Sequence, residues 1–161
     1  MDKPKIYLET TMFSFYDETR DYGEYPKYKA HVREVFERVK SGEYEPYTSS
    51  FAIEEIMNET DQEKRERMAA LVIEYGVRVL DESDEVTRLA GLYIQEGAVS
   101  SFYETDAAHI ATATVYGLDF IVSLNFNHIV RPWTIERVRR VNKREGYQGI
   151  GIYKPAEVLE L

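Results

Sequence analysis

Hydrophobic residues along the chain follow two alternating patterns. Short apolar or β-branched runs, each bounded by polar residues, predict strands at residues 5–8, 44–48, 77–80, 120–123 and 149–153. Intervening segments place apolar residues three and four positions apart, as in Val32, Val35, Phe36 and Val39, which predicts an amphipathic helix ending near Gly42. Similar spacing predicts three further helices with apolar residues within 53–57, 68–75 and 86–94; Ser49 or Ser50 is expected to cap the first, and a break near 58–61 separates it from the second. Flanking residues that begin and end helices predict others over 106–116, 134–145 and 155–157.

The alternation of strands and helices predicts an α/β fold in which a five-stranded, mainly parallel sheet lies between helices, because parallel neighbours need crossover connections. We expect helices to end at Gly76 and Gly117, and Thr105 to cap the helix that follows it. Residues 17–26 are expected to form a loop. No linker or internal repeat divides the sequence, so residues 1–161 are interpreted as a single domain.

Composition and charge exclude several classes of protein. The 161 residues contain no cysteine, which excludes disulfides, cysteine-based zinc sites and thiol nucleophiles. No apolar run approaches the roughly 18 residues of a membrane span, so we expect a cytoplasmic protein without membrane contact. Since 20 basic and 29 acidic side chains give a net charge of −9, any contact with nucleic acid requires a local basic face.

Polar side chains follow three of the predicted strands and begin one of the predicted helices. Glu9 follows the first strand, Glu55 lies shortly after the second, Asp106 begins an apolar helix and Asn125 follows the fourth strand. The adjacent Glu54 is the alternative to Glu55. Because sites on parallel sheets gather at the carboxyl ends of strands, these side chains are expected to meet. Carboxylate and amide oxygens are ligands for hard divalent cations, so the sequence predicts a metal site there.

Common catalytic signatures, including nucleotide-binding glycine loops and the H-E-x-x-H zinc motif, are absent from the sequence. The three histidines are too dispersed to predict a zinc cluster. We interpret His109 and His128 as structural residues and leave both out of the predicted site.

Several short motifs add a family resemblance. They are Ile6-Tyr7-Leu8-Glu9-Thr10-Thr11, Thr48-Ser49-Ser50 with Glu55-Ile56, Asp106-Ala107-Ala108-His109-Ile110-Ala111, Ser123-Leu124-Asn125-Phe126-Asn127-His128-Ile129 and a tail containing Pro155-Ala156-Glu157. In order and spacing they resemble the motifs of PIN-domain proteins, and the tail is similar to that of a VapC-like subgroup. The resemblance implies an Mg²⁺- or Mn²⁺-dependent endoribonuclease of toxin–antitoxin type, which forms a homodimer and has an antitoxin protein as partner.

The resemblance also implies roles for the predicted site residues. Glu9 and Asp106 are expected to hold the ion, Glu55 to hold it or orient the attacking water, and Asn125 to hydrogen-bond that water or a ligand. Most PIN domains carry Asp at the first position, where this chain has Glu9. The fourth position is Asp or Asn in the family, and Asn125 keeps an oxygen acceptor but lacks a charge. These two features leave an alternative open. In that alternative the chain is a catalytically impaired, PIN-like nucleic-acid-binding, protein-binding or regulatory domain.

Side chains around these positions supply supporting contacts and positive charge. We expect Thr10, Ser49 and Ser123 to fix the carboxylates. A predicted basic stripe of Arg137, Arg140 and Arg144, spaced along one helix, is expected to bind RNA phosphates while Trp133 or Tyr147 stacks on a base. A solvated helix face, or a surface for an acidic partner, is the alternative use of this stripe.

Overall fold

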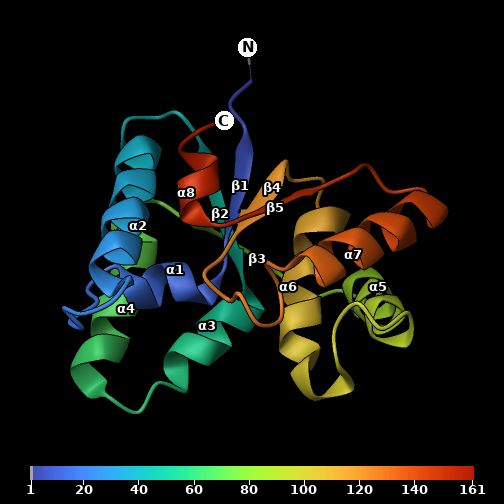
Figure 1. The fold of residues 1–161 in the computed structure, drawn as a ribbon, viewed down its shortest axis with the longest axis horizontal. Helices are drawn as coiled ribbons and strands as arrows, with labels where there is room; N and C mark the ends of the chain where they lie inside the picture. The colour runs from blue at the N-terminus through green and yellow to red at the C-terminus, as the bar shows by residue number, and fades with distance from the viewer. Residues whose placement is uncertain (1) are drawn as a thin grey trace.

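The central element of the computed structural model, which describes residues 2–161, is a five-stranded sheet in which every pairing is parallel. The strand order is β3-β2-β1-β4-β5 (Figure 1). The predicted α/β fold with a parallel sheet is confirmed. The strands are β1 (Lys5–Leu8), β2 (Glu45–Ser49), β3 (Arg78–Leu80), β4 (Phe120–Val122) and β5 (Gly151–Tyr153).

Helices cover both faces of the sheet and so form a three-layer arrangement (Figure 1). One layer contains α1 (Thr10–Phe15), α2 (Tyr25–Lys40), α4 (Gln62–Glu74) and α8 (Pro155–Val158). The other contains α5 (Asp84–Gln95), α6 (Glu104–Val115) and α7 (Pro132–Arg144). The helix α3 (Ser50–Met57) follows β2 beyond its carboxyl end, and a short 3₁₀ helix, η1 (Ser101–Tyr103), precedes α6.

Residues of the central strand β1 alternate between the two layers. Ile6 and Leu8 are fully buried among side chains of α1, α2 and α4, whereas Tyr7 is fully buried among those of α5, α6 and α7. Both faces of the strand are therefore apolar, as expected for a strand covered by helices on each side. This explains why its sequence shows a continuous run rather than an alternation.

Most predicted boundaries are confirmed to within a few residues. At Gly76 and Gly117 the backbone φ angles are +61° and +71°, which glycine adopts without the steric cost that a Cβ would add. The prediction that Thr105 caps a helix is wrong: α6 already begins at Glu104, so Thr105 lies inside the helix. The helix α1, which occupies six residues directly after Glu9, was not predicted because it is too short to show a period.

The carboxyl ends of β1, β2 and β4 lie next to one another in the middle of the sheet, since β1 pairs with both of the others. The segments that leave these ends begin with Glu9, with Ser50 of α3, and with Ser123. This edge of the sheet therefore collects the predicted site. Among residues 2–161, no helix is both long enough and apolar enough to cross a membrane.

Candidate functional site

Glu9 is a buried carboxylate at the end of β1, with only 2% of the residue exposed. Its Oε1 accepts hydrogen bonds of 2.5 Å from Thr11 Oγ1 and from Ser123 Oγ. Burial raises the pKa of Glu9, although the nearby His109 and the two hydroxyl donors oppose that shift. A charged Glu9 is therefore costly in this position unless a cation joins it.

Glu55 projects from α3 toward the same place. Ser49 caps this helix by accepting a hydrogen bond from the backbone N–H of Ala52. The Glu55 Oε1 atom accepts hydrogen bonds of 2.6 Å from Thr10 Oγ1 and from His109 Nε2. Burial raises the pKa of Glu55, but the hydrogen bond and charge of His109 outweigh burial, and the net pKa is lowered.

The neighbouring Glu54 is exposed, as expected for adjacent positions that point about 100° apart on a helix. Of the two acids, the structure therefore brings only Glu55 to Glu9.

His109 lies at the centre of a buried hydrogen-bond chain. Its Nε2 pairs with Glu55, its Nδ1 lies 2.6 Å from the Tyr7 hydroxyl, and that hydroxyl lies 2.6 Å from Ser49 Oγ. Burial lowers the pKa of His109, but the carboxylates of Glu55 and Glu9 raise it, and the net pKa is raised. Both ring nitrogens are thus engaged, and the imidazole fixes the orientation of Glu55.

Glu9, Glu55 and His109 lie close enough together to act as a group of metal ligands. One ligand atom from each lies within 4.8 Å of the others. Asp106, in the first turn of α6, lies outside this group and is held by His128, whose Nδ1 is 3.1 Å from Asp106 Oδ2. Burial raises the pKa of Asp106, and the charge of Glu55 adds to this rise. The charges of His109 and His128 oppose it, and the net pKa of Asp106 is raised. The charge of Asp106 therefore acts on the same site.

Asn125 shapes the loop that approaches Asp106. Its Oδ1 accepts a 3.0 Å hydrogen bond from the backbone N–H of His128, and its own backbone N–H donates to Ser123 Oγ. A hydrogen bond from the Asn125 side chain lowers the pKa of Asp106, and the His128 ring stacks on Tyr103 at 3.6 Å. Asn125 is thus near the site, with its side-chain oxygen already used to hold the turn.

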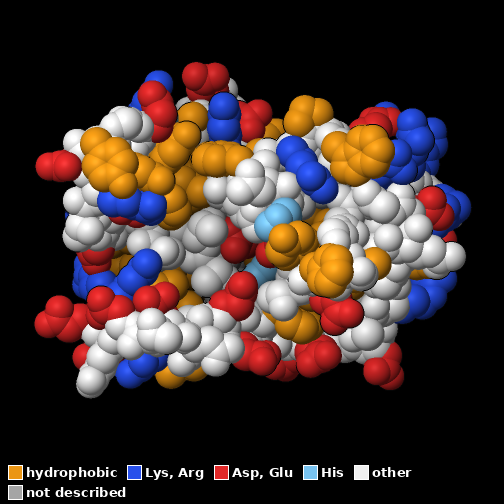
Figure 2. All heavy atoms as spheres, turned by 60° about the horizontal axis from the view of Figure 1, so that its bottom comes forward, with side chains coloured by type: hydrophobic (Ala, Val, Ile, Leu, Met, Phe, Trp, Pro, Cys, Tyr) orange, Lys and Arg blue, Asp and Glu red, His pale blue; other side chains and the backbone are white. Residues whose placement is uncertain are grey.

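The carboxylates of Glu9, Glu55 and Asp106, which we call the acidic group, have no Lys or Arg partner among residues 2–161. In residues 2–161, the ion pairs of Glu55 and Asp106 are with histidines, and no Lys or Arg pairs with either of them or with Glu9. Figure 2 shows acidic and histidine side chains together at the centre of the face that carries the strand ends. Three carboxylates with at most histidine compensation fit a hard divalent cation, which supplies the missing positive charge and accepts oxygen ligands.

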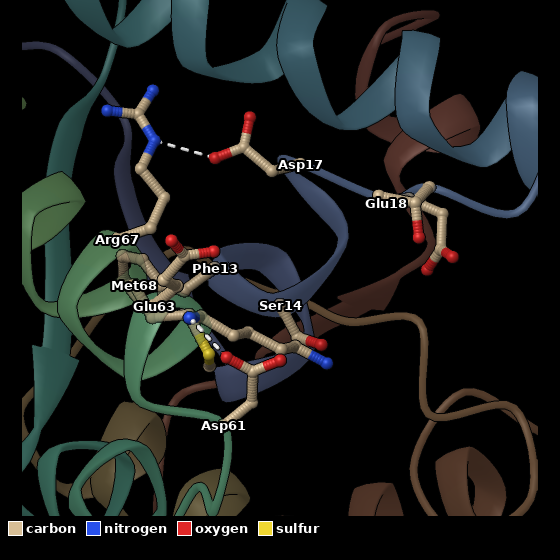
Figure 3. Close-up of a pocket in the computed structure, with 10 residues that line it drawn as sticks. Phe13, Ser14, Asp17, Glu18, Asp61, Glu63, Arg67 and Met68 are labelled. Carbon is tan, nitrogen blue, oxygen red and sulfur yellow. Dashed lines mark hydrogen bonds and ion pairs between the residues drawn. The ribbon is translucent and has the colours of Figure 1, made fainter.

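Acidic side chains also line a hollow of about 320 Å³ between α1 and α4, apart from the acidic group (Figure 3). Of its four acidic lining residues, Asp17 pairs with Arg67 and with Arg33, each at 2.6 Å, Glu18 pairs with Arg20, and Asp61 accepts a hydrogen bond from the backbone N–H of Lys64 at the start of α4. These contacts account for all of the acidic lining residues except Glu63. The hollow therefore does not compete with the Glu9 group as a metal site.

Comparison with known proteins adds information at the level of the fold. No family model and no curated protein sequence matches the chain. Among solved structures, it resembles VapC20 of Mycobacterium tuberculosis, a toxin that cleaves the sarcin-ricin loop, with a TM-score of 0.52 and 13% identity over 72% of this chain and 86% of that one. It also resembles VapBC2 of Rickettsia felis, solved bound to a fragment of promoter DNA, with a TM-score of 0.53 and 10% identity over 93% of this chain and 98% of that one.

This chain has a VapC-like PIN fold. The predicted resemblance is confirmed at that level. Of the predicted positions, Glu9 and Glu55 lie together with His109, while Asp106 lies with Asn125 and His128 and feels the charge of Glu55. Of the predicted supporting hydroxyls, Thr10 and Ser123 contact carboxylates directly, whereas Ser49 contacts Tyr7 and reaches Glu55 only through Tyr7 and His109.

The predicted basic stripe on α7 is largely engaged within the PIN fold. Arg137 donates to the Glu96 carbonyl and stacks on Trp133 at 3.7 Å. Arg144 pairs with Glu96 at 2.7 Å, and Arg140 pairs with Glu136 at 3.1 Å. The role of this stripe in substrate binding stays a prediction, and RNA phosphates would have to compete with these acceptors.

Two residues of the candidate site were missed by the sequence analysis. His109 was assigned a structural role only, and Tyr7 was interpreted as part of an apolar strand. The spacing of His109 three positions after Asp106 places both on one side of α6 and was a usable signal. No sequence signal marked Tyr7, because its hydroxyl acquires its role only from the placement of Ser49 and His109.

Proposed function

We propose that this chain is a metal-dependent endoribonuclease that hydrolyses RNA phosphodiester bonds, and that it acts as the toxin of a toxin–antitoxin pair. The observation that carries the proposal is the buried acidic group at the carboxyl ends of β1, β2 and β4. Its carboxylates have no Lys or Arg partner among residues 2–161. An anionic site of this kind suits a divalent cation far better than a structural role.

Glu9, Glu55 and Asp106 are the residues that would hold Mg²⁺ or Mn²⁺. When bound, such an ion stabilises charge on phosphoryl oxygens and lowers the pKa of water, so a covalent protein nucleophile is not needed. The chain's own contribution is to fix the carboxylates. Thr11 and Ser123 orient Glu9, and Thr10 and His109 orient Glu55. Asn125 and His128 position Asp106.

The choice of RNA and the toxin role rest on the structural neighbours. VapC20 is described as a toxin that cleaves the sarcin-ricin loop, and VapBC2 was solved bound to DNA of its promoter. By this likeness we propose RNA as the substrate, an antitoxin protein as a partner, homodimer formation and a cytoplasmic location. Co-expression with the product of a small adjacent reading frame should relieve any growth arrest caused by this chain if the toxin role is correct.

A cleavage assay with matched variants tests the nuclease. Purified protein should cut a labelled single-stranded RNA in Mn²⁺ or Mg²⁺ and not in EDTA. Glu9→Gln and Asp106→Asn should abolish cleavage because each removes a charge that holds the ion. Glu54→Gln, which alters the exposed neighbour of Glu55, should cleave normally.

Two results would contradict the proposal. Cleavage that persists in EDTA, or in both site variants, would place the chemistry elsewhere. Binding of RNA by the wild type without cleavage in either ion would instead favour the impaired binding or regulatory domain that Glu9 and Asn125 left as an alternative.

A further inference from the structure

A cluster of aromatic rings lies beside the acidic group. The rings belong to Phe15 of α1, Tyr25 and Tyr28 of α2, and Phe126 of the loop after β4, and we call them the aromatic surface. Tyr28 is the hub, with ring centroids 6.2 Å from Phe15, 6.4 Å from Tyr25 and 5.4 Å from Phe126. All four residues remain partly exposed. They therefore form a continuous apolar surface open to solvent.

The aromatic surface is hollowed rather than flat. Three adjoining hollows, of about 160, 420 and 470 Å³, are each lined by Tyr28 and Phe126. On the face shown in Figure 2, hydrophobic side chains with interspersed Lys and Arg adjoin the central acidic and histidine side chains. A chain-like ligand lying along these hollows would meet ring faces and edges at successive positions.

Basic side chains flank the aromatic surface. Arg131 and Lys154 line the hollows, and neither takes part in an ion pair among residues 2–161. Arg20 stacks on Tyr25 at 3.7 Å while it pairs with Glu18. The acids Glu24 and Glu157 also line the hollows. Arg131 Nε donates a 2.7 Å hydrogen bond to Thr134 Oγ1. What sets Arg131 and Lys154 apart is that neither pairs with a carboxylate among residues 2–161, whereas Arg139, Arg140 and Arg144 of α7 each do.

Short covalent and hydrogen-bonded links join the aromatic surface to the acidic group. Phe126 directly follows Asn125, and the backbone N–H of Leu124 donates to Thr11 Oγ1, the same hydroxyl that donates to Glu9. Phe15 ends the helix α1, which begins at Thr10. The two segments that hold the carboxylates therefore also carry two of the four rings.

We propose that the aromatic surface binds a single-stranded segment of RNA next to the acidic group, with bases stacked on Tyr28 and Phe126 and phosphates held by Arg131 and Lys154. Every base has a face that can stack on an aromatic ring, and unpaired strands expose those faces. The two unpaired cations beside apolar rings, in a chain of net charge −9, favour an anionic polymer over a purely apolar protein segment. The inference rests on the proposed nuclease function and assigns its substrate path.

Binding measurements on matched variants test the proposed surface. The affinity for a fluorescein-labelled single-stranded RNA of mixed sequence is measured by anisotropy in EDTA, which prevents cleavage. Tyr28→Leu keeps an apolar side chain but removes stacking, and should weaken binding about 10-fold. The double variant Arg131→Gln/Lys154→Gln should reduce the slope of log affinity against log salt concentration by about 1.4, because two phosphate contacts are lost.

Control variants make the same chemical changes away from the surface. Lys143→Gln removes an exposed cation from α7, and Tyr116→Leu removes an exposed ring at the end of α6. Both should bind RNA like the wild type. Thermal melting checks that all variants fold, and Lys154→Gln alone, at an exposed position, gives a second reading if Tyr28→Leu destabilises the protein.

The outcomes separate the surface from the proposed function. Unchanged affinity and salt slope in the surface variants, with wild-type protein that still binds and cleaves RNA, would overturn the surface and leave the nuclease standing. Variants that bind RNA normally but self-associate more weakly would assign the surface to a protein contact and would also overturn the proposal. A wild type that neither binds nor cleaves RNA would remove the proposed function itself.

Discussion

Single residues account for the unusual electrostatics of the site. Glu9 is almost completely enclosed, yet it sits among two hydroxyl donors and a histidine rather than beside an arginine. The hydroxyls satisfy its hydrogen bonding without neutralising its charge. A metal-free protein therefore holds a carboxylate whose pKa is raised by burial, and a bound cation would reverse that penalty.

The raised pKa of Glu9 predicts a pH effect on the metal-free protein. A carboxyl group whose pKa is higher in the folded state contributes stability below its ordinary value of 4.5, and this contribution is lost as the pH rises through the raised pKa. The raised pKa of His109 acts in the same direction from its ordinary value of 6.5 upward. Urea unfolding in EDTA should therefore show the stability of the wild type falling relative to Glu9→Gln as the pH rises above the ordinary carboxyl value of 4.5. A difference that is flat, or grows with pH, would contradict this account, and Glu54→Gln serves as the control.

Removal of one hydroxyl donor should weaken metal binding without removing a ligand. Ser123 donates to Glu9 and accepts from the backbone N–H of Asn125, so Ser123→Ala frees both. Loss of such an orienting contact typically costs about 10–100-fold in metal affinity or activity. Mn²⁺ titration by calorimetry should show this loss, whereas Ser41→Ala, at an exposed position after α2, should bind Mn²⁺ like the wild type. Equal affinities for Ser123→Ala and wild type would show that Glu9 does not depend on this hydroxyl.

At the scale of elements, buried polar contacts join the helices of one layer. The Tyr93 hydroxyl of α5 donates a hydrogen bond of 2.6 Å to Asn142 Oδ1 of α7 and lies 3.2 Å from Thr114 Oγ1 of α6. Tyr93 is fully buried, and Asn142 nearly so. These contacts fix the three helices relative to one another, and α6 carries both Asp106 and His109.

Tyr93→Phe should therefore destabilise the whole layer. The change leaves the Asn142 oxygen without its short hydrogen bond in a buried place, which costs about 1–3 kcal/mol. The free energy of unfolding in urea should fall by this amount. Tyr22→Phe, which makes the same change at a residue 62% exposed, should leave it unaltered. A stability equal to that of the wild type for Tyr93→Phe would mean that water replaces the lost hydroxyl.

At the scale of the whole molecule, the proposed metal binding is coupled to folding, because the proposed ligands directly follow β1 or lie in α3 and α6. These elements are distant in the sequence, so an unfolded chain offers no assembled site. An ion that binds only the folded state stabilises it by about 2.7 kcal/mol at a concentration 100 times its dissociation constant. For a chain of 161 residues, each kcal/mol corresponds to roughly 2–4 °C in melting temperature.

Mn²⁺ at such a concentration should raise the melting temperature of the wild type by about 5–11 °C. Glu9→Gln and Asp106→Asn should each lose most of this shift, because each removes negative charge from the ion's surroundings. Scanning calorimetry with Ca²⁺ and with EDTA provides the comparison. An equal shift in wild type and in both variants would mean that Mn²⁺ stabilises the protein through another site.

The fold was largely predictable from local patterns, and the site was predictable in part. Strands at 5–8 and 120–123 and the helix around Val32 to Val39 were evident because apolar periodicity and burial agree there. The six-residue helix α1 was not evident, because it is too short to show a period. Its position depends on the hydrogen bonds that Thr10 donates to Glu55 and Thr11 donates to Glu9. The arginines of α7 form a stripe in sequence, but their acceptors on Glu96 and Glu136 become apparent only in the structure.

Local sequence patterns were enough to predict the five strands, most of the helices and a mainly parallel sheet. They also predicted that Glu9, Glu55 and Asn125 lie at one edge, because strand ends in such a sheet share a direction, and that Asp106 joins them from the start of a helix. Other features are visible only once the chain is folded: His109 and Tyr7 connect Ser49 to Glu55, His128 holds Asp106, and Phe15 and Phe126 meet at Tyr28. These contacts join segments far apart in the chain. Their distances depend on how whole layers pack, which local periodicity does not encode.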